Sequence, residues 1–260
     1  MGGNESFREK GAGQMKIRIE LVDSYRNLPE DYWQRLGAFY AENVWNMTTE
    51  EATGKIRDLF ADYEAEYAVK WYEVFAYSKD KLVGCMRILR NPDNRTRWYF
   101  CDVHTGKKYR KKGVATAMYE KAIQTVETFY AAEYIDASIS AENAGSIALH
   151  KKMGFYDTGK SPKFAHFWFE PDETRYERRL LLEYPASDSE IHRRILYKLY
   201  RSYQKSLGAE KPQNVAKEVK AMLSEYDDFR LVFCGNRAVG FRYCKQDTQI
   251  LFVEEDSSLR

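Results

Sequence analysis

The sequence predicts a mixed α/β fold of the α+β class, in which a central, mostly antiparallel sheet is flanked by helices. Three observations support this prediction. Two amphipathic helical segments precede a strand hairpin, strands and helices then alternate, and a helix–helix–hairpin order recurs near the C-terminus. The recurrence predicts a smaller C-terminal α/β half-repeat.

The first part of the chain shows the periodicities of helices and strands in turn. Apolar residues recur on one helical face after Pro29 and again after Thr48. Apolar runs on both sides of a polar turn at residues 78–81 predict a hairpin, and Gly154 is a typical left-handed cap after a helix. The expected elements are helices from 29 and from 48, strands over 72–77, 82–89 and 98–103, a helix to 130, a strand over 134–139, a helix over 146–153, and strands over 155–158 and 176–184.

Composition divides the chain into three parts. These are a polar, Gly-rich and loose tail at residues 1–14, a first domain at 15–185, and the half-repeat at 186–260. Residues 77–84 align with 233–240, and two helical segments precede the hairpin each time, although coincidence would explain so thin an identity. Because no second phosphate-binding turn follows Gly240, we do not expect the half-repeat to bind the same ligand alone.

Charge and composition argue against several classes of protein. The 260 residues carry a net charge of +2, so there is no global basic field and we expect no nucleic-acid partner. The absence of a secretory segment and of a long apolar span predicts a cytoplasmic protein with no membrane contact. The four cysteines lack CxxC or metal-ligand spacing, so we expect buried free thiols and no metal site.

The most informative segment is residues 109–116, which follow a predicted strand and open a predicted helix. Backbone N–H groups at a helix start lack intrahelical partners, and the helix dipole favours an anion there. Residues 110–112 are all basic, while Gly113 and Ala115 are small enough to let a ligand approach the backbone. The segment matches neither a P-loop nor a GxGxxG turn. It therefore predicts a phosphate-binding turn of another kind.

Two motifs together indicate which kind of phosphate-binding turn this is. The turn reads Arg-x-x-Gly-x-Ala from Arg110 to Ala115, and a second block over 143–155 opens a helix with Asn143 and ends in Gly-Phe. With a helix and a strand between these blocks, residues 15–184 resemble the GNAT superfamily of acyl-CoA-dependent N-acyltransferases. The resemblance implies a GNAT-like fold, an acyltransferase activity, and acetyl-CoA or another acyl-CoA as cosubstrate. The C-terminal part then looks like a partial second GNAT-like repeat.

The resemblance also implies which residues bind the cofactor. Backbone amides of residues 111–116 would grip the pyrophosphate, Asn143 would hydrogen-bond the cofactor, and the N–H of Val103 would polarise the thioester carbonyl. For Asn143, a helix N-cap is a compatible alternative. The connection between Val103 and the turn is about two residues longer than is usual in the family. The predicted cofactor-binding residues are Val103, Arg110, Lys111, Lys112, Gly113, Val114, Ala115, Thr116, Asn143 and Ser146.

Proton transfer needs a base and an acid. Asp102 lies on the strand that would follow the thioester, so it is the first candidate for the base, and Glu73 is the second. The alternative for Asp102 is a hydrogen bond near the strand end or a salt bridge to a lysine. His150 occupies the position where the family often has a tyrosine that protonates the leaving thiolate, and imidazole can replace it. A structural histidine is the alternative.

The acceptor site is less defined by the sequence. The first two helices combine aromatic residues with carboxylates, which suits a cationic amine. These residues are Trp33, Tyr40, Trp45, Glu50, Glu51 and Glu64. The loop over 160–172 is rich in aromatic residues, among them Phe164, His166 and Trp168. We expect it either to cover the acceptor site or to pack on the C-terminal part.

The predicted function is transfer of an acetyl group from acetyl-CoA to a primary amine, with a small-molecule amine favoured. Attack is expected to be direct, in a ternary complex, because no cysteine lies in the turn as a nucleophile. Three alternatives stay open: an acetyltransferase for protein N-termini or lysines, a non-catalytic acyl-CoA-binding or regulatory module, and a C-terminal part that serves interaction or homodimer formation.

Overall fold

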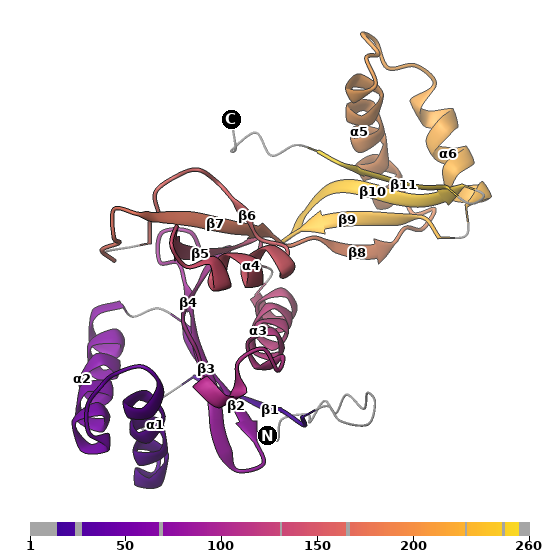
Figure 1. Ribbon diagram of the computed structural model, residues 1–260. Coiled ribbons are helices and arrows are strands. Elements are labelled where there is room, and N and C mark those ends of the chain that lie inside the picture. Colours follow the sequence, from indigo (N-terminus) through magenta and orange to yellow (C-terminus); the bar gives the residue numbers. More distant parts are fainter. Residues whose placement is uncertain are drawn as a thin grey trace. The chain divides into compact units, whose positions relative to one another are not determined.

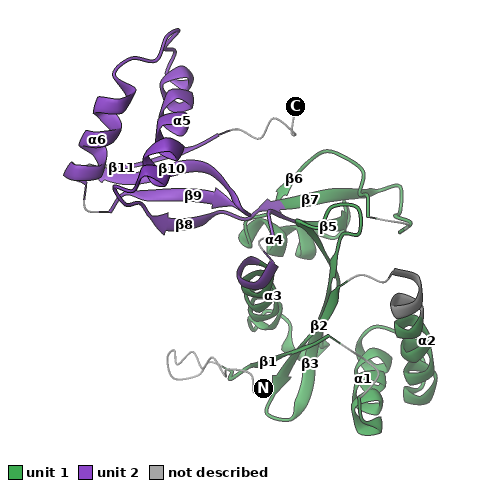
Figure 2. Cartoon of the chain, turned by 180° about the vertical axis from the view of Figure 1, so that it is seen from behind, with its two compact units in different colours: residues 1–126, 136–177 green, residues 127–135, 178–260 purple. Residues whose placement is uncertain are grey.

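The computed structural model describes residues 15–23, 28–67, 70–130, 132–164, 167–226, 228–245 and 248–254. The chain divides into two compact units (Figure 2). Unit 1 comprises residues 1–126 and 136–177, and unit 2 comprises residues 127–135 and 178–260. The second unit thus combines a short internal segment with the C-terminal part of the chain from Arg178 onward.

The first sheet has seven strands in the order β1-β2-β3-β4-β5-β7-β6. Its strands β1 to β4 are antiparallel neighbours, as are β6 and β7, which confirms the predicted mixed and mostly antiparallel class. The elements are β1 (Arg18–Val22), α1 (Glu30–Asn43), α2 (Thr49–Tyr67), β2 (Trp71–Ser78), β3 (Lys81–Arg90), β4 (Arg97–Thr105), the 3-10 turn η1 (Lys107–Tyr109), α3 (Val114–Tyr130), β5 (Tyr134–Ser140), α4 (Ala144–Lys152), β6 (Tyr156–Asp157) and β7 (Glu173–Arg179).

Helices cover both faces of this sheet (Figure 1). On β4, Tyr99 joins the apolar cluster beneath α1 and α2, while its neighbour Phe100 packs edge-on against Tyr119 of α3. Helices α1 and α2 approach closely because Gly37 has no side chain: a Cβ there would lie 1.9 Å from Oγ1 of Thr53. The two faces of β4 therefore serve two different helix layers.

Unit 2 contains a four-stranded sheet in the order β11-β10-β9-β8. Its elements are β8 (Leu182–Pro185), α5 (Glu190–Ser206), α6 (Val215–Glu225), β9 (Arg230–Cys234), β10 (Arg237–Lys245) and β11 (Thr248–Val253). Helices α5 and α6 lie on one face and share an apolar cluster with β9 and β10 (Figure 1). This is the element order and strand order of β1-α1-α2-β2-β3-β4 in unit 1.

The correspondence extends to the strand register. In unit 1 Val83 is an extra residue on β3, between the pairs Leu82–Tyr77 and Gly84–Ala76. In unit 2 Val239 is an extra residue on β10, between the pairs Ala238–Phe233 and Gly240–Val232. The two bulges fall at the positions that the alignment of 77–84 with 233–240 equates. Each residue of β10 therefore has a counterpart in β3 at an offset of 156 in residue number.

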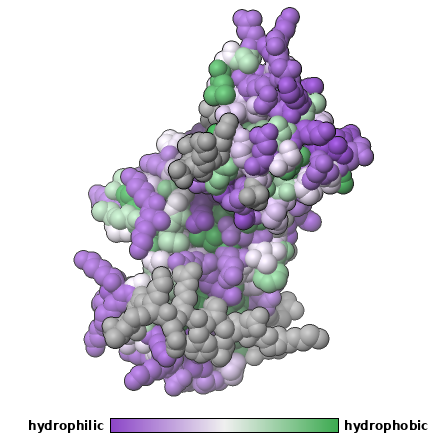
Figure 3. Space-filling model, turned by 90° about the vertical axis from the view of Figure 1, so that its right-hand side faces the viewer, coloured by the Kyte–Doolittle hydropathy of each residue, from purple (hydrophilic) through white to green (hydrophobic). Residues whose placement is uncertain are grey.

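The surface and the thiols complete the description. The face in Figure 3 is mainly hydrophilic, with small and separate hydrophobic areas. None of the helices described is long and apolar enough to cross a membrane. All four cysteines are free; Cys85 and Cys234 are buried and Cys101 is half-buried. Cys244 is exposed, so the expectation of a buried thiol is wrong there, because its side chain leaves the apolar cluster at the end of β10.

Candidate functional site

The segment between β4 and α3 has the geometry of an anion-binding turn. Lys111 and Gly113 both adopt left-handed backbone conformations, with φ of +60° and +82°, and both are exposed. The N–H of Ala117 donates to the carbonyl of Gly113 at 3.0 Å, which begins the ladder of α3. The N–H groups of residues 114–116 precede that first bond, so they have no intrahelical acceptor. They point toward the turn.

The charges around this helix start are unusual within the chain. Among the six α-helices of the described residues, α1, α2, α5 and α6 carry acidic residues in the first turn, and α3 and α4 carry none. An acidic side chain at that position stabilises the positive end of the helix dipole. In α3 the preceding residues 110–112 are instead basic and exposed. An anion bound from outside would supply the missing negative charge.

The residues between β4 and the turn are held to unit 1 by hydrogen bonds from their backbone N–H groups. The N–H of Gly106 donates to the carbonyl of Val83 at 2.9 Å, and the N–H of Lys107 donates to Oδ1 of Asn43 at 3.0 Å. Strand β4 extends to Thr105. The prediction that the strand ends at residue 103 was two residues short, because a polar His-Thr pair looks like loop in the sequence. The connection between the end of β4 and the turn is correspondingly short.

A β-bulge interrupts β4 just before this point. Cys101 pairs with Arg87 and His104 pairs with Cys85, so Asp102 and Val103 together face the single residue Met86. Asp102 has φ of +51°, a left-handed conformation that costs a non-glycine residue about 1 to 3 kcal/mol. Bulges re-aim side chains, and they are frequent beside active sites. Here the bulge leaves the Asp102 side chain 41% exposed.

Asp102 ends a chain of buried charges. Arg87 has no exposed surface, and its Nη1 donates to Oδ2 of Asp102 at 2.8 Å. Its Nε donates to Oε2 of Glu73 at 2.9 Å, and Glu73 is also fully buried. The ring of Phe60 lies 4.8 Å from the guanidinium carbon. The ion pair of Asp102 is therefore with an arginine, and Glu73, the second candidate base, lies in the interior.

His104 is the next polar residue on the strand, and the sequence did not single it out. Its ring is half-buried and stands edge-on to the ring of Tyr40 in α1, with centroids 5.5 Å apart. Burial lowers the pKa of His104, and the charges of Arg87 and Arg110 lower it further, while Asp102 raises it. The imidazole is thus uncharged at neutral pH. Recognising the longer strand would have revealed this position.

His150, the predicted proton donor, is buried with both ring nitrogens engaged. Nδ1 lies 2.8 Å from the carbonyl oxygen of Ser146, which only accepts, so Nδ1 carries the hydrogen. Nε2 then accepts from the hydroxyl of Tyr119 at 2.6 Å. Burial lowers the pKa of His150 and keeps it uncharged, and the ring of Phe155 packs edge-on against it. These contacts favour the structural alternative.

Asn143 and Ser146 lie at the start of α4. Oδ1 of Asn143 accepts the N–H of Ser146 at 3.0 Å, so Asn143 is the N-cap of the helix. Asn143 is exposed, and its amide nitrogen has no protein partner within the part of the chain that is described. The cap and a cofactor contact are thus compatible. The Ser146 hydroxyl lies 3.2 Å from Nδ1 of His150.

The aromatic loop packs on the core beneath α1 and α2. Phe164 is buried and stacks on Tyr99 with centroids 4.9 Å apart, and Phe167 and Phe169 pack against the same cluster. Trp168 is 75% exposed. His166 lies outside the described residues. The described contacts thus place the loop on the predicted acceptor side.

The predicted acceptor carboxylates differ in their roles. Oε2 of Glu51 accepts the N–H and the hydroxyl of Thr48, both at 2.8 Å, which closes a capping box at the start of α2 and lowers the pKa of Glu51. Glu50 is exposed. The side chain of Glu64 lies outside the described part of the chain. Glu51 therefore stabilises a helix end.

The predicted acceptor aromatics are covered by cations of the protein itself. Trp45 lies 4.8 Å from the Tyr40 ring, and the Lys55 ammonium lies 4.5 Å from the Trp45 centroid. Trp33 faces the guanidinium of Arg57 at 5.4 Å. Both indoles can thus hold a cation.

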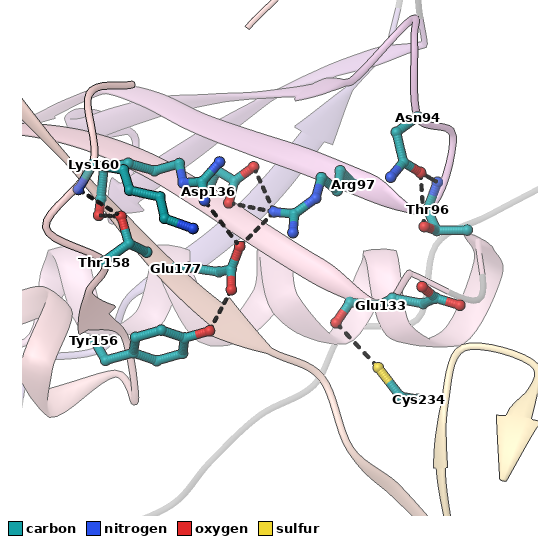
Figure 4. A network of polar contacts seen from close by, with 11 residues as sticks. Asn94, Thr96, Arg97, Glu133, Asp136, Tyr156, Thr158, Lys160, Glu177 and Cys234 are labelled. Carbon is teal, nitrogen blue, oxygen red and sulfur yellow. Dashed lines mark hydrogen bonds and ion pairs between the residues drawn. The ribbon is translucent and has the colours of Figure 1, made fainter. Parts of the chain in front are cut away.

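A second polar cluster connects four strands elsewhere in unit 1 (Figure 4). Nη1 of Arg97 donates to Oδ1 of Asp136 at 2.8 Å and to Oε2 of Glu177 at 2.6 Å. The hydroxyl of Tyr156 donates to Oε1 of Glu177. Burial raises the pKa of Asp136 to about 6. Because these groups satisfy one another, the cluster is a structural link between β4, β5, β6 and β7.

The comparison with known families decides the assignment. A model described as the acetyltransferase (GNAT) family matches residues 25–155, about half of the chain. The chain belongs to the GNAT family of acetyltransferases. The match includes α1 to α4 and therefore contains both the predicted phosphate-binding turn and the helix that Asn143 caps. Acetyltransferases of this family use acetyl-CoA, the cosubstrate that the sequence resemblance implies.

Solved GNAT structures resemble part of this chain. One is a paiA N-acetyltransferase from Thermoplasma acidophilum in complex with coenzyme A, with 11% identity and a TM-score of 0.45 over 62% of this chain and 99% of that one. Another is a chimeric spermidine N-acetyltransferase from Vibrio cholerae and hSSAT, with 14% identity and a TM-score of 0.45 over 62% and 95%. A third is a ribosomal-protein alanine N-acetyltransferase from Escherichia coli, with 12% identity and a TM-score of 0.43 over 62% and 93%. No curated protein matches the chain.

Proposed function

We propose that this GNAT enzyme transfers an acetyl group from acetyl-CoA to the primary amine of a small molecule, by direct attack in a ternary complex. One observation carries the proposal. A single strand–turn–helix segment places the polar bulge of β4 directly before the anion-binding turn of α3. Such a segment can hold the phosphates of a cosubstrate at one end and its thioester at the other.

The cosubstrate is bound mainly by backbone in this proposal. The N–H groups of residues 111–116 donate to the pyrophosphate, with Arg110, Lys111 and Lys112 supplying positive charge nearby. The exposed amide nitrogen of Asn143 donates to the cofactor from the start of α4. Gly113 is needed because its left-handed backbone, with φ of +82°, turns consecutive N–H groups toward one anion.

The reacting carbonyl lies beside the bulge of β4. Val103 lies in this bulge, and in this proposal its N–H donates to the thioester oxygen. Negative charge that develops on this oxygen in the transition state is stabilised by such a donor. Asp102 lies next to it, with its ion pair to Arg87 on one side and solvent on the other.

A small acceptor fits the surroundings better than a protein chain does. The aromatic loop closes on Tyr99 through Phe164, which narrows the acceptor side of unit 1. The indoles of Trp33 and Trp45 already hold cations of the protein, so a ligand ammonium group can take the same positions. The favoured acceptor is a compact amine that carries positive charge.

A panel of amines tests the proposal. The purified chain is mixed with acetyl-CoA and spermidine, lysine, phenethylamine, kanamycin or a peptide with an N-terminal alanine, and release of the CoA thiol is recorded. We expect at least one small amine to be acetylated faster than the peptide, with the product confirmed by mass. Acetyl-CoA binding without turnover of any amine would refute the activity, whereas turnover of the peptide alone would refute only the small-molecule acceptor.

A further inference from the structure

We infer that His104 is the general base that takes the proton from the attacking amine, and that Asp102, held by Arg87, acts through it by stabilising the imidazolium that forms. This inference rests on the proposed function. It departs from the sequence-based candidate, Asp102, because one oxygen of that carboxylate already accepts from a buried guanidinium at 2.8 Å. His104 stands two residues further along β4, on the side of α1.

The position of unit 2 that is equivalent to His104 shows which side chain is sufficient for packing there. The pair Cys85–His104 in unit 1 corresponds to the pair Phe241–Phe252 in unit 2, because Gly84–Thr105 and Gly240–Val253 are equivalent. Tyr40 and His104 lie edge-on at 5.5 Å and 69°, while Tyr203 and Phe252 lie edge-on at 5.4 Å and 61°. A phenylalanine therefore satisfies this contact. The nitrogens of His104 are not needed for packing.

The buried charges of unit 1 are also replaced in unit 2. Glu73 and Arg87 correspond to Phe229 and Tyr243 when the ladder is continued by one residue, and these two rings stack at 5.6 Å and 19°. Buried ion pairs are often no more stable than apolar residues of similar volume. The shared fold is therefore compatible with aromatic residues at these two positions. The ion pair of unit 1 thus needs an explanation other than packing.

The bulge that carries Asp102 is confined to unit 1 as well. Strands β10 and β11 pair without interruption from Gly240–Val253 to Lys245–Thr248, so the second unit has one residue fewer at this place. The carboxylate, its buried arginine and the imidazole are therefore absent together from unit 2. Their joint presence beside the turn of unit 1 indicates that they act as a group.

The arrangement suits proton transfer from an amine. The charged groups that face His104 are Asp102 and Arg87 from the sheet and Arg110 from the turn, and the ionisable neighbours are Tyr40 of α1 and Cys85 of β3. The half-buried imidazole is uncharged and can accept a proton, and the nearby carboxylate stabilises the imidazolium that forms. Arg87 keeps that carboxylate in place.

The step balances without a further reactant. The amine nitrogen forms a bond to the thioester carbonyl carbon while its proton passes to the imidazole of His104. The bond between the carbonyl carbon and sulfur then breaks, and the electron pair leaves with the CoA sulfur. That sulfur takes up a proton from the imidazolium or from water, which returns His104 to its uncharged form. The products are an amide and CoA thiol.

The test is His104→Phe, which copies the residue of unit 2 and should keep the contact with Tyr40. With the fastest amine of the panel, kcat/KM at pH 7.5 should fall by about 100- to 1000-fold. Acetyl-CoA affinity by calorimetry and the thermal midpoint should stay near wild type. The wild-type rate should decline as the pH falls below the lowered pKa of His104, and the variant should lack this decline. In His104→Ala, which leaves the space of the ring empty, imidazole added to the buffer should restore part of the rate.

A matched control and three outcomes make the result decisive. His192→Phe, the same substitution on α5 of unit 2, should leave the rate unchanged. If His104→Phe keeps kcat/KM within about threefold and retains the pH profile, the general-base role is wrong while the proposed function stands. If it loses acetyl-CoA binding in parallel with the rate, His104 is a binding residue and the inference is also wrong. If wild type acetylates no amine, the proposed function fails and this inference fails with it.

Discussion

Unit 1 and unit 2 share an order of helices and strands and a bulge at equivalent valines, Val83 and Val239, but they fill the space beneath their helices differently. Unit 2 uses stacked aromatic rings, with Phe229, Phe241 and Tyr243 in contact. Unit 1 places Glu73 and Arg87 at the positions of Phe229 and Tyr243, and it places His104 where unit 2 has Phe252. The difference shows that the shared scaffold can be filled without buried charge, so we propose that the charge of unit 1 serves its chemistry.

The units also differ beyond the last strand of the shared pattern. In unit 1, β4 continues into η1, the basic turn and α3. In unit 2, β11 ends at Val253 and is followed by Glu254, whose N–H donates to the carbonyl of Val239 at 2.7 Å. Glu254 thus stands where unit 1 has Gly106, whose N–H donates to the equivalent carbonyl of Val83. Among the residues that the structure describes, the charged filling and the basic turn at a helix start both occur in unit 1 and not in unit 2.

The largest expected effect comes from breaking the buried charge pair. Arg87→Met leaves Glu73 buried without its partner and should destabilise the protein by about 3 to 5 kcal/mol. Urea unfolding at pH 7.5 measures this loss. The double variant Glu73→Leu/Arg87→Met gives unit 1 an apolar filling like that of unit 2. It should regain most of the lost stability, as apolar replacement of buried ion pairs often does, and remain inactive.

If the double variant were as unstable as Arg87→Met alone, the claim that unit 1 tolerates an apolar filling would be contradicted. Such a result would mean that unit 1, unlike unit 2, needs the ion pair for folding. Activity at the wild-type level in a well-folded double variant would instead show that the charges have no part in catalysis.

The second effect concerns the turn. Gly113→Glu places a carboxylate where we propose that the cosubstrate phosphates bind, and it should weaken acetyl-CoA binding by about 100-fold or more, near 2.7 kcal/mol. Gly208→Glu in unit 2 is the matched control, since Gly208 and Gly113 both have positive φ, +90° and +82°, and a Cβ at either would meet no atom within 4 Å. Calorimetry should show normal binding for the control. Equal binding by both variants would contradict the phosphate site.

The third effect is a dependence of stability on pH. Burial lowers the pKa of His150 below the value of about 6.5 that it has in the unfolded chain. Below that pH the unfolded chain binds a proton that the folded chain does not, so stability should fall as the pH decreases. The slope has an upper limit of about 1.4 kcal/mol per pH unit for each such group.

Urea unfolding at pH 7.5 and 5.5 checks this effect. His150→Gln removes the titrating group and should reduce the difference in unfolding free energy between the two values of pH. The remaining slope should include His104, whose pKa is lowered in the same direction. An undiminished slope in the variant would show that the proton uptake occurs elsewhere.

The smallest effect distinguishes two helix caps. Asn143 caps α4 in unit 1 and Ser189 caps α5 in unit 2, each through a side-chain oxygen that accepts a backbone N–H. Replacing either with alanine should cost about 1 kcal/mol of stability. Only Asn143→Ala should also weaken acetyl-CoA binding, measured by calorimetry. Equal binding by both variants would limit Asn143 to its structural role.

The sequence was most informative where backbone geometry dictates the residue type. Gly113 and Asn143 mark helix starts that a short motif specifies, and the antiparallel sheet follows from local periodicity, so these features were predictable. The capping box of Thr48 and Glu51 was readable from its spacing too, although Glu51 was assigned to the acceptor side. The acceptor-side expectation rested on composition, whereas the cap follows from spacing.

The contacts of the candidate site depend on how strands and helices are aligned with one another, and no local sequence pattern encodes that alignment. The pairing of Arg87 with Glu73 and Asp102 joins three strands, so it appears only when the strands are aligned. The bulge at Asp102 breaks the alternation of side chains along β4, so the polar pair of His104 and Thr105 looked like loop in the sequence. The contact of His150 with Tyr119 likewise requires two helices to be placed together.

The bulge of β4 has a further consequence for how such a site can arise. Side chains alternate along a strand, so an insertion of one residue normally reverses the facing of every later position. Here Cys101 and His104 both face the helix layer of α1, as Ile250 and Phe252 face that of α5 with one residue between them instead of two. Because the left-handed turn at Asp102 absorbs the inserted residue, a strand can gain a carboxylate by insertion while every inward-facing neighbour keeps its place.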